Sequence, residues 1–413
     1  MFDYIIIGGG ISGLYNYIKL LEKNENLKIK LFEKNDYFGG RIRQHNEYYL
    51  GHEYSFPCGA ARFNINHKNV IKLMKEFGLL DMRTHKGQIP NTKFIDVKNE
   101  FNENPQKKDG YDYINEILKH ASKIDSYTLK QYTFQEFAEK YVSKKEMDYI
   151  LNSCGYSGQL KYMNMYDAKR LFGEGIRNDV KFWLGKFQLL INKMIEYLKY
   201  KHANIRLRTN VKSIQYNTKN DAYRITYNDF FVYARKVVLC LPKEALLKIN
   251  LLNPIKNILD ETISTKPLCR VYAIFDKSET WLKNIKQKIF TNNELRFIIP
   301  IDPENGLIMI SYTDDIHTQF WHKRKNNQTI LKKTIVKLVN DTFNIKINEP
   351  LKVIVCYWKS GVAYWNKNIN SDIVSKYIAN PFPNIYICGE NYSQNQSWVE
   401  GSLESCNHFL SKQ

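Results

Sequence analysis

The stretch MFDYIIIGGGISG, residues 1–13, decides the fold. Tyr4–Ile7 form a β-branched apolar run, a G-x-G-x-x-G turn follows, and the chain continues from Leu14 with a helical pattern. A strand, a tight glycine turn and a helix in this order hold a dinucleotide pyrophosphate on the free N–H groups of the helix. The stretch therefore predicts an α/β protein with a nucleotide site at Gly8, Gly10, Ile11, Ser12 and Gly13.

The segment after the first helix carries the second half of this signal. Leu27–Phe32 (LKIKLF) reads as a strand, and Glu33 closes it about 20 residues after the glycines, where a carboxylate binds a ribose hydroxyl. The stretch KNDYFGGR that follows brings Gly39 and Gly40 for close backbone approach and Arg41 for a bidentate phosphate contact. A solvated turn with a surface arginine would explain KNDYFGGR alone, so the preceding motif decides in favour of a cofactor site.

Length, charge and hydropathy narrow the class of protein. A chain of 413 residues can build two substantial lobes with separate cores. The formal charge of +19 raises the question whether the protein binds nucleic acid. Because lysine is spread along the chain with abundant Asn, Ile and Tyr, we do not expect nucleic-acid binding as the main function. No apolar run approaches the roughly 20 residues of a membrane span, and the first strand leaves no room for a signal peptide, so we expect a soluble protein.

The seven cysteines are scattered without a C-x-x-C pair. An odd, unclustered set is typical of reduced thiols, which predicts a cytoplasmic protein without a disulfide framework or a structural zinc site. No metal is expected, and we see no convincing Ser/His/Asp spacing. The sequence leaves a homodimer open.

Periodicity predicts the other elements. Helices are expected over 66–80, through much of 111–172, over 187–198 and 329–338, and from 399. Strands are expected at 204–207, 211–216, 223–227, 236–241, 270–275, 295–301, 307–312, 351–357 and 384–388. The polar residues 81–110 are expected to form an extended or hairpin insertion. Nucleotide-binding signals are thus dispersed along the chain, and the strand-rich segments between them should form a second lobe.

The end of the chain carries a family resemblance. Ile387–Ser405 (ICGENYSQNQSWVEGSLES), with the G-G-R stretch after Glu33, resembles the flavin-containing amine oxidase superfamily, which includes monoamine oxidases and L-amino-acid oxidases. The resemblance covers most of the chain and implies FAD rather than NAD. By it, Gly389 and Glu390 contact the ribityl–diphosphate part, Trp398 stands beside the isoalloxazine ring, and Val399 begins the helix beneath it. Without that motif, Trp398 would read as an ordinary core aromatic.

The resemblance also implies the domain organisation. In this superfamily a Rossmann-like FAD-binding domain is assembled from discontinuous segments, which here correspond to residues 1–80, 182–248 and 366–413. Residues 81–181 and 249–365 then form a mixed-sheet substrate-binding domain with a helical cap. Val211, in the middle segment of the first domain, is placed at the cofactor.

A second aromatic residue is implied at the substrate site. Gly361–Tyr364 (GVAY) resembles the segment that carries one aromatic wall of the substrate cage. Tyr364 and Trp398 would then flank the path to the flavin, and two aromatic faces orient an amine and attract its cationic form. The residue before this tyrosine is a flavin-linking cysteine in monoamine oxidases and is Ala363 here, so the resemblance implies non-covalent FAD.

The segment Gly59, Ala60, Ala61 and Arg62 bears on the substrate. It resembles the G-x-M-R segment of L-amino-acid oxidases and tryptophan monooxygenase-like enzymes, in which the arginine binds the substrate carboxylate beside the flavin. A guanidinium fork suits a carboxylate. The alternative is that Arg62 binds an FAD phosphate or a structural carboxylate, and the sequence does not choose between the two.

One departure from the family concerns a lysine near flavin N5. In the corresponding stretch LCRVYAIFDKSETW, ungapped spacing from Trp281 leads to Val271, and a shift of one leads to Arg270. Neither is lysine. That lysine is associated with the reaction of reduced flavin with oxygen. Its absence therefore puts the rate of this reaction in question, and the sequence leaves open whether Arg270 replaces the lysine.

Together these features predict an FAD-dependent enzyme that oxidises a C–N bond. The neutral amine would deliver a hydride to flavin N5, water would hydrolyse the imine, and molecular oxygen would be reduced to hydrogen peroxide. Arg62 makes an L-amino acid the first choice of substrate and a simple amine or polyamine the second. The alternatives are a non-amine FAD oxidoreductase of the same fold, such as a desaturase, a protoporphyrinogen-type oxidase or a sugar mutase, and a scaffold protein that retains FAD.

Overall fold

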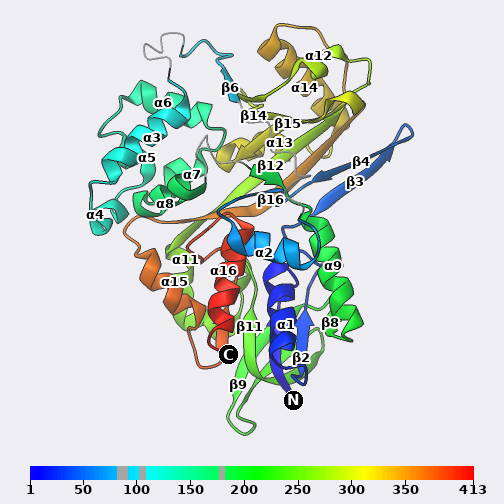
Figure 1. The fold of residues 1–413 in the computed structure, drawn as a ribbon, viewed down its shortest axis with the longest axis vertical. Helices are drawn as coiled ribbons and strands as arrows, with labels where there is room; N and C mark the ends of the chain where they lie inside the picture. The colour runs from blue at the N-terminus through cyan, green and yellow to red at the C-terminus, as the bar shows by residue number, and fades with distance from the viewer. Residues whose placement is uncertain (81–91, 102–107, 176–181) are drawn as a thin grey trace.

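Two β-sheets lie one above the other along the long axis of the molecule (Figure 1). They belong to a computed structural model that describes residues 1–80, 92–101, 108–175 and 182–413. The two termini lie close together at the lower end, where the Tyr4 hydroxyl donates to Gln413 Oε1 at 2.9 Å. The fold is α/β, as the sequence predicts.

The lower sheet, in the described part of the chain, has seven strands in the order β8-β2-β1-β11-β10-β9, and β17 pairs with β11 as well. The strands β8, β2, β1, β11 and β17 are parallel, while β9 and β10 form an antiparallel meander on β11. The start, the middle and the end of the chain contribute β1 (Phe2–Ile7), β2 (Ile29–Phe32), β8 (Asn204–Arg206), β9 (Val211–Asn217), β10 (Ala222–Tyr227), β11 (Phe230–Leu239) and β17 (Ile385–Ile387).

Strand β1 lies at the centre of this sheet because it is apolar on both faces. Tyr4 and Ile6 pack into one core, and Ile5 and Ile7 pack into the other. A parallel strand that is covered on both sides needs such a continuous apolar run. The first core contains α1 (Ile11–Lys23), α2 (Lys68–Glu76), α9 (Phe187–Tyr200) and α16 (Val399–Leu410). The second contains α10 (Lys243–Leu246), the 3-10 helix η1 (Asn250–Ile255), α11 (Lys256–Glu261) and α15 (Ser371–Ala379).

Among the described residues, the upper sheet has the strand order β16-β12-β15-β14-β13-β6, and only its β13–β6 pair is parallel. Its strands are β6 (Thr92–Ile95), β12 (Ile263–Ile274), β13 (Lys288–Thr291), β14 (Phe297–Asp302), β15 (Leu307–Asp314) and β16 (Lys352–Trp365). The short helices α12 (Thr280–Asn284), η2 (Pro303–Asn305), η3 (Asp315–His317) and α13 (Thr318–His322) and the longer α14 (Gln328–Phe343) connect them. The sequence predicts only α14, because the others are too short to show a period.

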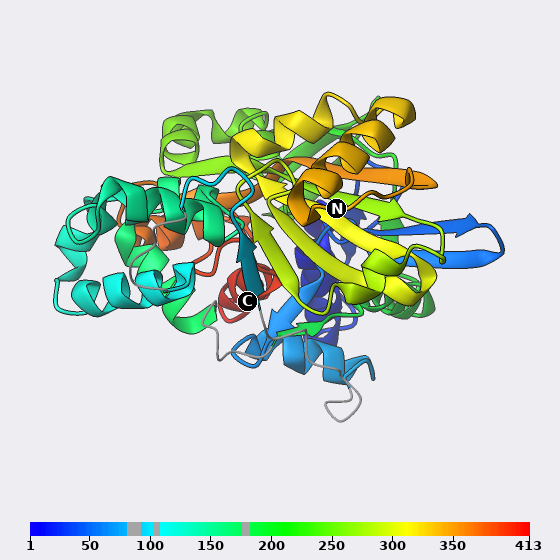
Figure 2. The same cartoon turned by 90° about the horizontal axis from the view of Figure 1, so that it is seen from above.

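Six helices stand beside the upper sheet as a cap, which Figure 2 shows from above. Asp109, Thr133 and Ser143 begin three of them with reciprocal capping boxes, which explains why the helices start at these residues. Tyr364 of β16 is part of the apolar core of this cap. The helices of the helical cap are α3 (Gly110–Ala121), α4 (Ser126–Lys130), α5 (Phe134–Ala138), α6 (Lys144–Ser153), α7 (Gly158–Tyr162) and α8 (Met165–Gly175).

A disulfide joins Cys58 to Cys356, two residues that are 298 positions apart in the sequence. Cys58 follows the hairpin of β3 (Gln44–Tyr49) and β4 (His52–Pro57), and the end of this hairpin lies against β16, where the Trp358 indole N–H donates to Cys58 O at 2.7 Å. The expectation of reduced thiols throughout is therefore wrong for this pair. The cytoplasmic location was inferred from free thiols, so it stays a prediction, and the Cys58–Cys356 disulfide argues against it.

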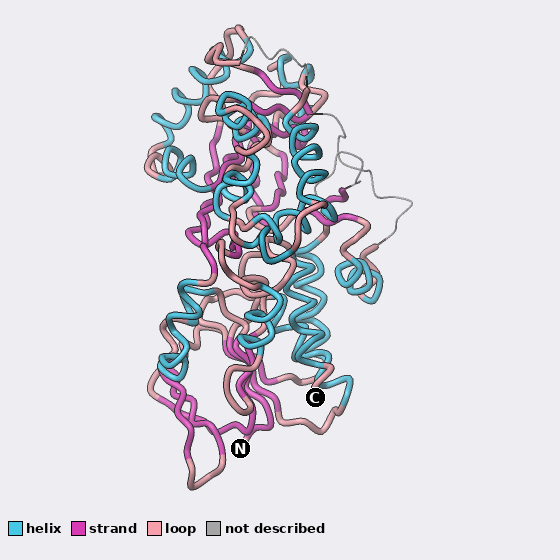
Figure 3. The backbone as a smooth tube through the Cα atoms, turned by 90° about the vertical axis from the view of Figure 1, so that its left-hand side faces the viewer, coloured by secondary structure: helices cyan, strands magenta, loops and turns pink. Residues whose placement is uncertain are grey.

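The predicted strands all overlap observed ones, but β11, β12 and β16 extend well beyond their apolar stretches. Of the expected insertion, residues 81–91 and 102–107 lie outside the described residues, and 92–95 form β6. Seen from the side, the two sheets follow each other along the long axis (Figure 3). The lower sheet takes its strands from 1–80, 182–248 and 366–413 and the upper sheet from the segments between, while the domain boundaries stay a prediction.

Candidate active site

A cavity of about 860 Å³ lies between the two sheets and the helical cap. Apart from Gly13, every residue that the sequence places at cofactor or substrate lines it. These residues are Gly8, Gly10, Ile11, Ser12, Glu33, Gly39, Gly40, Arg41, Gly59, Ala60, Ala61, Arg62, Val211, Arg270, Tyr364, Gly389, Glu390, Trp398 and Val399. The fold thus brings both ends and the middle of the chain to one place.

Two glycine turns form the lower end of the cavity. Gly39 N–H donates to Gly9 O at 2.8 Å, and Gly10 and Gly39 pair as an isolated bridge. A Cβ on Gly8 would lie 2.2 Å from Cys240 O, whereas a Cβ on Gly10 would meet nothing nearer than 3.9 Å and would fill cavity space. Gly10 also begins α1 without a side-chain cap, so the N–H groups of the first turn are left for an anion.

The Glu33 carboxylate supports the first glycine turn. Its Oε2 accepts from Gly9 N–H and its Oε1 accepts from Asn35 N–H, each at 2.8 Å. A carboxylate has further lone pairs on the same oxygens, so it can also accept from a ribose hydroxyl in the cavity. The side chain is buried at the end of β2, as expected for a ribose-binding residue.

Arg41 joins the second glycine turn to the end of the chain. Its Nη2 lies 2.8 Å from Glu390 Oε2, and its Nη1 donates to Gly361 O at 3.1 Å. Since guanidinium has five N–H donors and the Arg41 side chain is 33% exposed, donors remain for a phosphate. Beside Glu390, Gly389 has φ +147° and no atom within 4 Å of an added Cβ, so it leaves room for a ligand.

Gly13 has a packing role. A Cβ at this position would lie 1.9 Å from Gly8 O, so its absence lets α1 pack closely against the end of β1. Val211 begins β9 and lines the cavity beside Thr209 and Asn210. Gly13 thus allows close packing at the first glycine turn, and Val211 adds an apolar side chain to the cavity wall.

Two aromatic residues that the sequence singles out line the cavity from different segments. Tyr364 lies on β16 and is 2% exposed, and burial raises the pKa of its hydroxyl well above the ordinary value. Trp398 is the N-cap of α16, and its ring stacks on Phe182 with centroids 5.8 Å apart. Their roles as flavin-side walls stay predictions.

Two arginines and two tyrosines meet where the upper sheet borders the cavity. Arg62 Nη2 donates to the Tyr156 hydroxyl at 2.9 Å, and Arg270 Nη2 donates to the Tyr312 hydroxyl at 3.1 Å. The rings of Tyr156 and Tyr312 lie edge to face with centroids 4.9 Å apart, so the two arginine–tyrosine pairs adjoin. We call these four residues the guanidinium cluster; all of them line the cavity.

The structure distinguishes the two positions that the sequence leaves open for the missing lysine. Successive residues of a strand point to opposite faces. Val271 is fully buried in the apolar core of the upper sheet, and Arg270 lines the cavity. The Arg270 Nε is buried without a hydrogen-bond partner among the described residues.

Sequence reasoning missed Tyr156, Tyr312 and Asp314. Asp314 is buried in the cavity wall, where its carboxylate accepts from Ser157 N–H at 3.0 Å and Gly158 N–H at 2.7 Å, and burial raises its pKa. Tyr312 and Asp314 share one face of β15, which a period of two in the strand could have indicated. Nothing in the sequence shows that this face borders a cavity.

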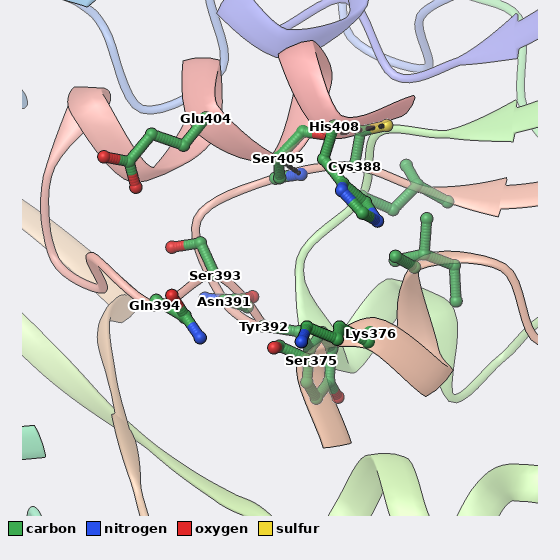
Figure 4. Close-up of a pocket in the computed structure, with 14 residues that line it drawn as sticks. Ser375, Lys376, Cys388, Asn391, Tyr392, Ser393, Gln394, Glu404, Ser405 and His408 are labelled. Carbon is green, nitrogen blue, oxygen red and sulfur yellow. Dashed lines mark hydrogen bonds between the residues drawn. The ribbon is translucent and has the colours of Figure 1, made fainter. Parts of the chain in front are cut away.

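A smaller cavity of about 180 Å³ lies behind the Gly389 loop, between α15 and α16 (Figure 4). Lys376 and His408 line it, and it shares Leu241, Gly389 and Asn391 with the main cavity. It contains none of the other residues predicted for the site.

The fold and the main cavity define a protein of the dinucleotide-binding α/β class whose cavity is bordered by a second sheet. Residues 11–407 match the family model of the flavin containing amine oxidoreductases, so the chain belongs to that family. FAD is its cofactor, as the glycine turn, Glu33 and the family resemblance predict. The residues present fit this group, because uncapped N–H groups and open glycine positions line the site.

Solved structures show the same fold. A wild-type putrescine oxidase bound to putrescine matches with a TM-score of 0.77 and 15% identity, over 100% of this chain and 98% of that chain. Cyclohexylamine oxidase from Brevibacterium oxydans IH-35A matches with a TM-score of 0.76 and 15% identity, over the same shares. A comparison with curated protein sequences finds no match. None of the described helices has the length and apolar character needed to cross a membrane.

Proposed function

We propose that this flavin amine oxidoreductase oxidises an L-amino acid to the imino acid and passes the electrons to molecular oxygen, forming hydrogen peroxide. The observation that carries the proposal is the guanidinium cluster. Arg270 and Tyr312 come from the upper sheet and Tyr156 from the cap, whereas the glycine turns that suit the cofactor phosphates adjoin the lower sheet, and this separation supports a substrate role for the cluster. When bound, the flavin takes a hydride from the carbon next to the nitrogen.

Arg62 binds the substrate carboxylate in this proposal. It lines the cavity next to Ala61, and the side chains whose pKa its charge affects belong to the cap and the upper sheet: Tyr111, Tyr156, Tyr272, Lys288 and Tyr312. A phosphate role would require Arg62 to reach the glycine turns, where Arg41 already lies. Arg270 lines the same wall, where its Nη2 donates to the Tyr312 hydroxyl.

Tyr364 and Trp398 orient the amine in this proposal, since an aromatic face attracts a cation and excludes water from the reacting carbon. Non-covalent attachment of FAD follows from Ala363, which is fully buried and has no nucleophilic side chain. Denaturation in acid should therefore release all of the flavin into the supernatant.

The test is anaerobic mixing of the flavoprotein with panels of L-amino acids and amines, followed by flavin absorbance. Amino acids should bleach the flavin, and air should restore the colour with formation of peroxide. Loss of a hydrogen bond to a charged group costs about 1.5–3 kcal/mol, so the Arg62→Ala variant should need about 10- to 100-fold more amino acid for half-maximal bleaching. Arg235→Ala is the matched control, since Arg235 is an exposed partner of Asp3.

A primary amine without a carboxylate is the second candidate. Asp314 favours it, because a buried carboxylate in the cavity wall can attract an ammonium group. Bleaching by amines alone, with no effect of Arg62→Ala, would select this candidate. Absence of bleaching by either panel would favour a non-amine substrate or a scaffold role.

A further inference from the structure

Both positive charges of the guanidinium cluster act on Tyr312 and on Tyr156, but only at Tyr312 do they outweigh burial. The Tyr312 hydroxyl accepts from Arg270 Nη2 at 3.1 Å, and the Arg270 guanidinium also lies 4.5 Å from the centroid of the Tyr312 ring. Its second neighbour is Tyr156, whose ring lies edge to face on it at 4.9 Å and whose hydroxyl accepts from Arg62 Nη2. One cation therefore polarises the Tyr312 oxygen by a hydrogen bond, and the other acts on it through space.

The surroundings of Tyr312 favour its anionic form. Phe297 of β14 stacks on the ring with centroids 6.1 Å apart and supplies no charge. Asp314, two residues along the strand, is occupied by the N–H groups of Ser157 and Gly158. Among the described residues, the charged and titratable groups that act on Tyr312 are Arg270 and Tyr272 from β12, Arg62 from β5 (Arg62–Asn64), Tyr156 from the loop before α7 and Tyr364 from β16.

An amino acid enters this cavity as an ammonium ion, but loss of hydride from carbon requires a lone pair on nitrogen. We propose that Tyr312, as the phenolate, is the base that removes this proton. The N–H bond breaks, the phenol O–H bond forms, and the electron pair stays on nitrogen. The proposal rests on the proposed function only in taking the substrate to be an amine that enters as a cation.

The charge balance of the cluster supports this role. Burial by itself raises the pKa of Tyr312, but the Arg270 and Arg62 guanidiniums more than offset burial and lower that pKa below its ordinary value of 10.0. A substrate carboxylate on Arg62 would reduce the positive charge that stabilises the phenolate. The phenolate then becomes a stronger base when the ammonium group arrives, and the proton that it accepts is released to solvent before the next turnover.

The first test needs no turnover. Phenolate absorbs in the near ultraviolet where phenol does not, so pH titration of the resting holoprotein, compared with Tyr312→Phe, isolates the ionisation of this side chain. We expect one phenolate to form below pH 10.0 in the wild type and to be missing from the variant. Tyr17→Phe is the control, because Tyr17 is buried in the core of the lower sheet, donates to Ile29 O, and should leave this ionisation in place. Ionisation of Tyr312 only together with the other tyrosines would overturn the proposal.

The second test is the pH dependence of anaerobic flavin reduction. At neutral pH the Tyr312→Phe variant should react about 10²- to 10⁴-fold more slowly per unit of substrate, and it should recover at a pH where the free substrate is already neutral. An equal loss at every pH would show a merely structural role and overturn the proposal. If neither amino acids nor amines reduce the wild-type flavin, the proposed function fails, and the ultraviolet titration still decides the ionisation of Tyr312.

Discussion

Replacement of Glu33 by glutamine tests the cofactor end of the cavity. The two carboxylate oxygens each accept one backbone N–H, from Gly9 and Asn35, at 2.8 Å. In Glu33→Gln only one of these positions can be an oxygen, and the amide NH₂ at the other faces an N–H donor. A ribose hydroxyl at this side chain also loses its charged acceptor. One charge-assisted hydrogen bond corresponds to about 1.5–3 kcal/mol, so the Kd for FAD should rise about 10- to 100-fold.

The assay is dilution of the holoprotein to equilibrium with measurement of free flavin fluorescence. Glu22→Gln is the matched control, because Glu22 is an exposed residue of α1 that pairs with Lys19. Its Kd should equal that of the wild type. An unchanged Kd for Glu33→Gln would refute the reasoning, since it would mean that neither the turn geometry nor the ribose contact depends on this carboxylate.

Three further outcomes are expected. Gly13→Ala places a Cβ 1.9 Å from a backbone oxygen and should lower the free energy of unfolding by about 3 kcal/mol. Gly173→Ala is the control, because a Cβ at Gly173 meets open space and should not destabilise the protein. Equal effects of the two substitutions in urea titrations would contradict this prediction. Cys58→Ser should cost about 2–5 kcal/mol, and a reductant should lower the wild-type unfolding midpoint but leave the variant unchanged, because the Cys356 bond is already lost. Burial lowers the pKa of His67 from 6.5 to about 4. Between these two pH values the unfolded chain binds a proton at His67 and the folded protein does not, so the free energy of unfolding should fall by up to about 3 kcal/mol as the pH drops from 6.5 to about 4. His67→Asn should remove this component, and an identical pH dependence in the variant would disprove the assignment.

The cofactor end of the site was predictable because its parts are local. The strand β1, the glycine turn, α1 and Glu33 follow one another within the first 33 residues, and each has its own signal in composition or period. The Gly39–Arg41 turn follows directly and pairs with the first turn. The cavity residues at the opposite end of the chain were predicted from a family resemblance, because Gly389, Glu390 and Trp398 lie in one short motif.

The guanidinium cluster was harder to predict because its parts are distant in the sequence. Tyr156 lies in a loop of the cap, Arg62 on a three-residue strand, and Arg270 and Tyr312 on neighbouring strands of the upper sheet. A strand pattern shows which residues share a face, but it does not show which face meets another lobe. For the same reason Val271 and Arg270 could not be separated before their burial was known.

The amino-acid sequence by itself determined the α/β class, the nucleotide turn with its acidic partner, and most of the helices and strands, because these depend on side-chain period and on consecutive residues. Only the tertiary structure decided the Cys58–Cys356 bond and the guanidinium cluster. Both depend on where the upper sheet lies against the Cys58–Arg62 segment, and that placement is set by the packing of apolar cores rather than by any local preference of the chain.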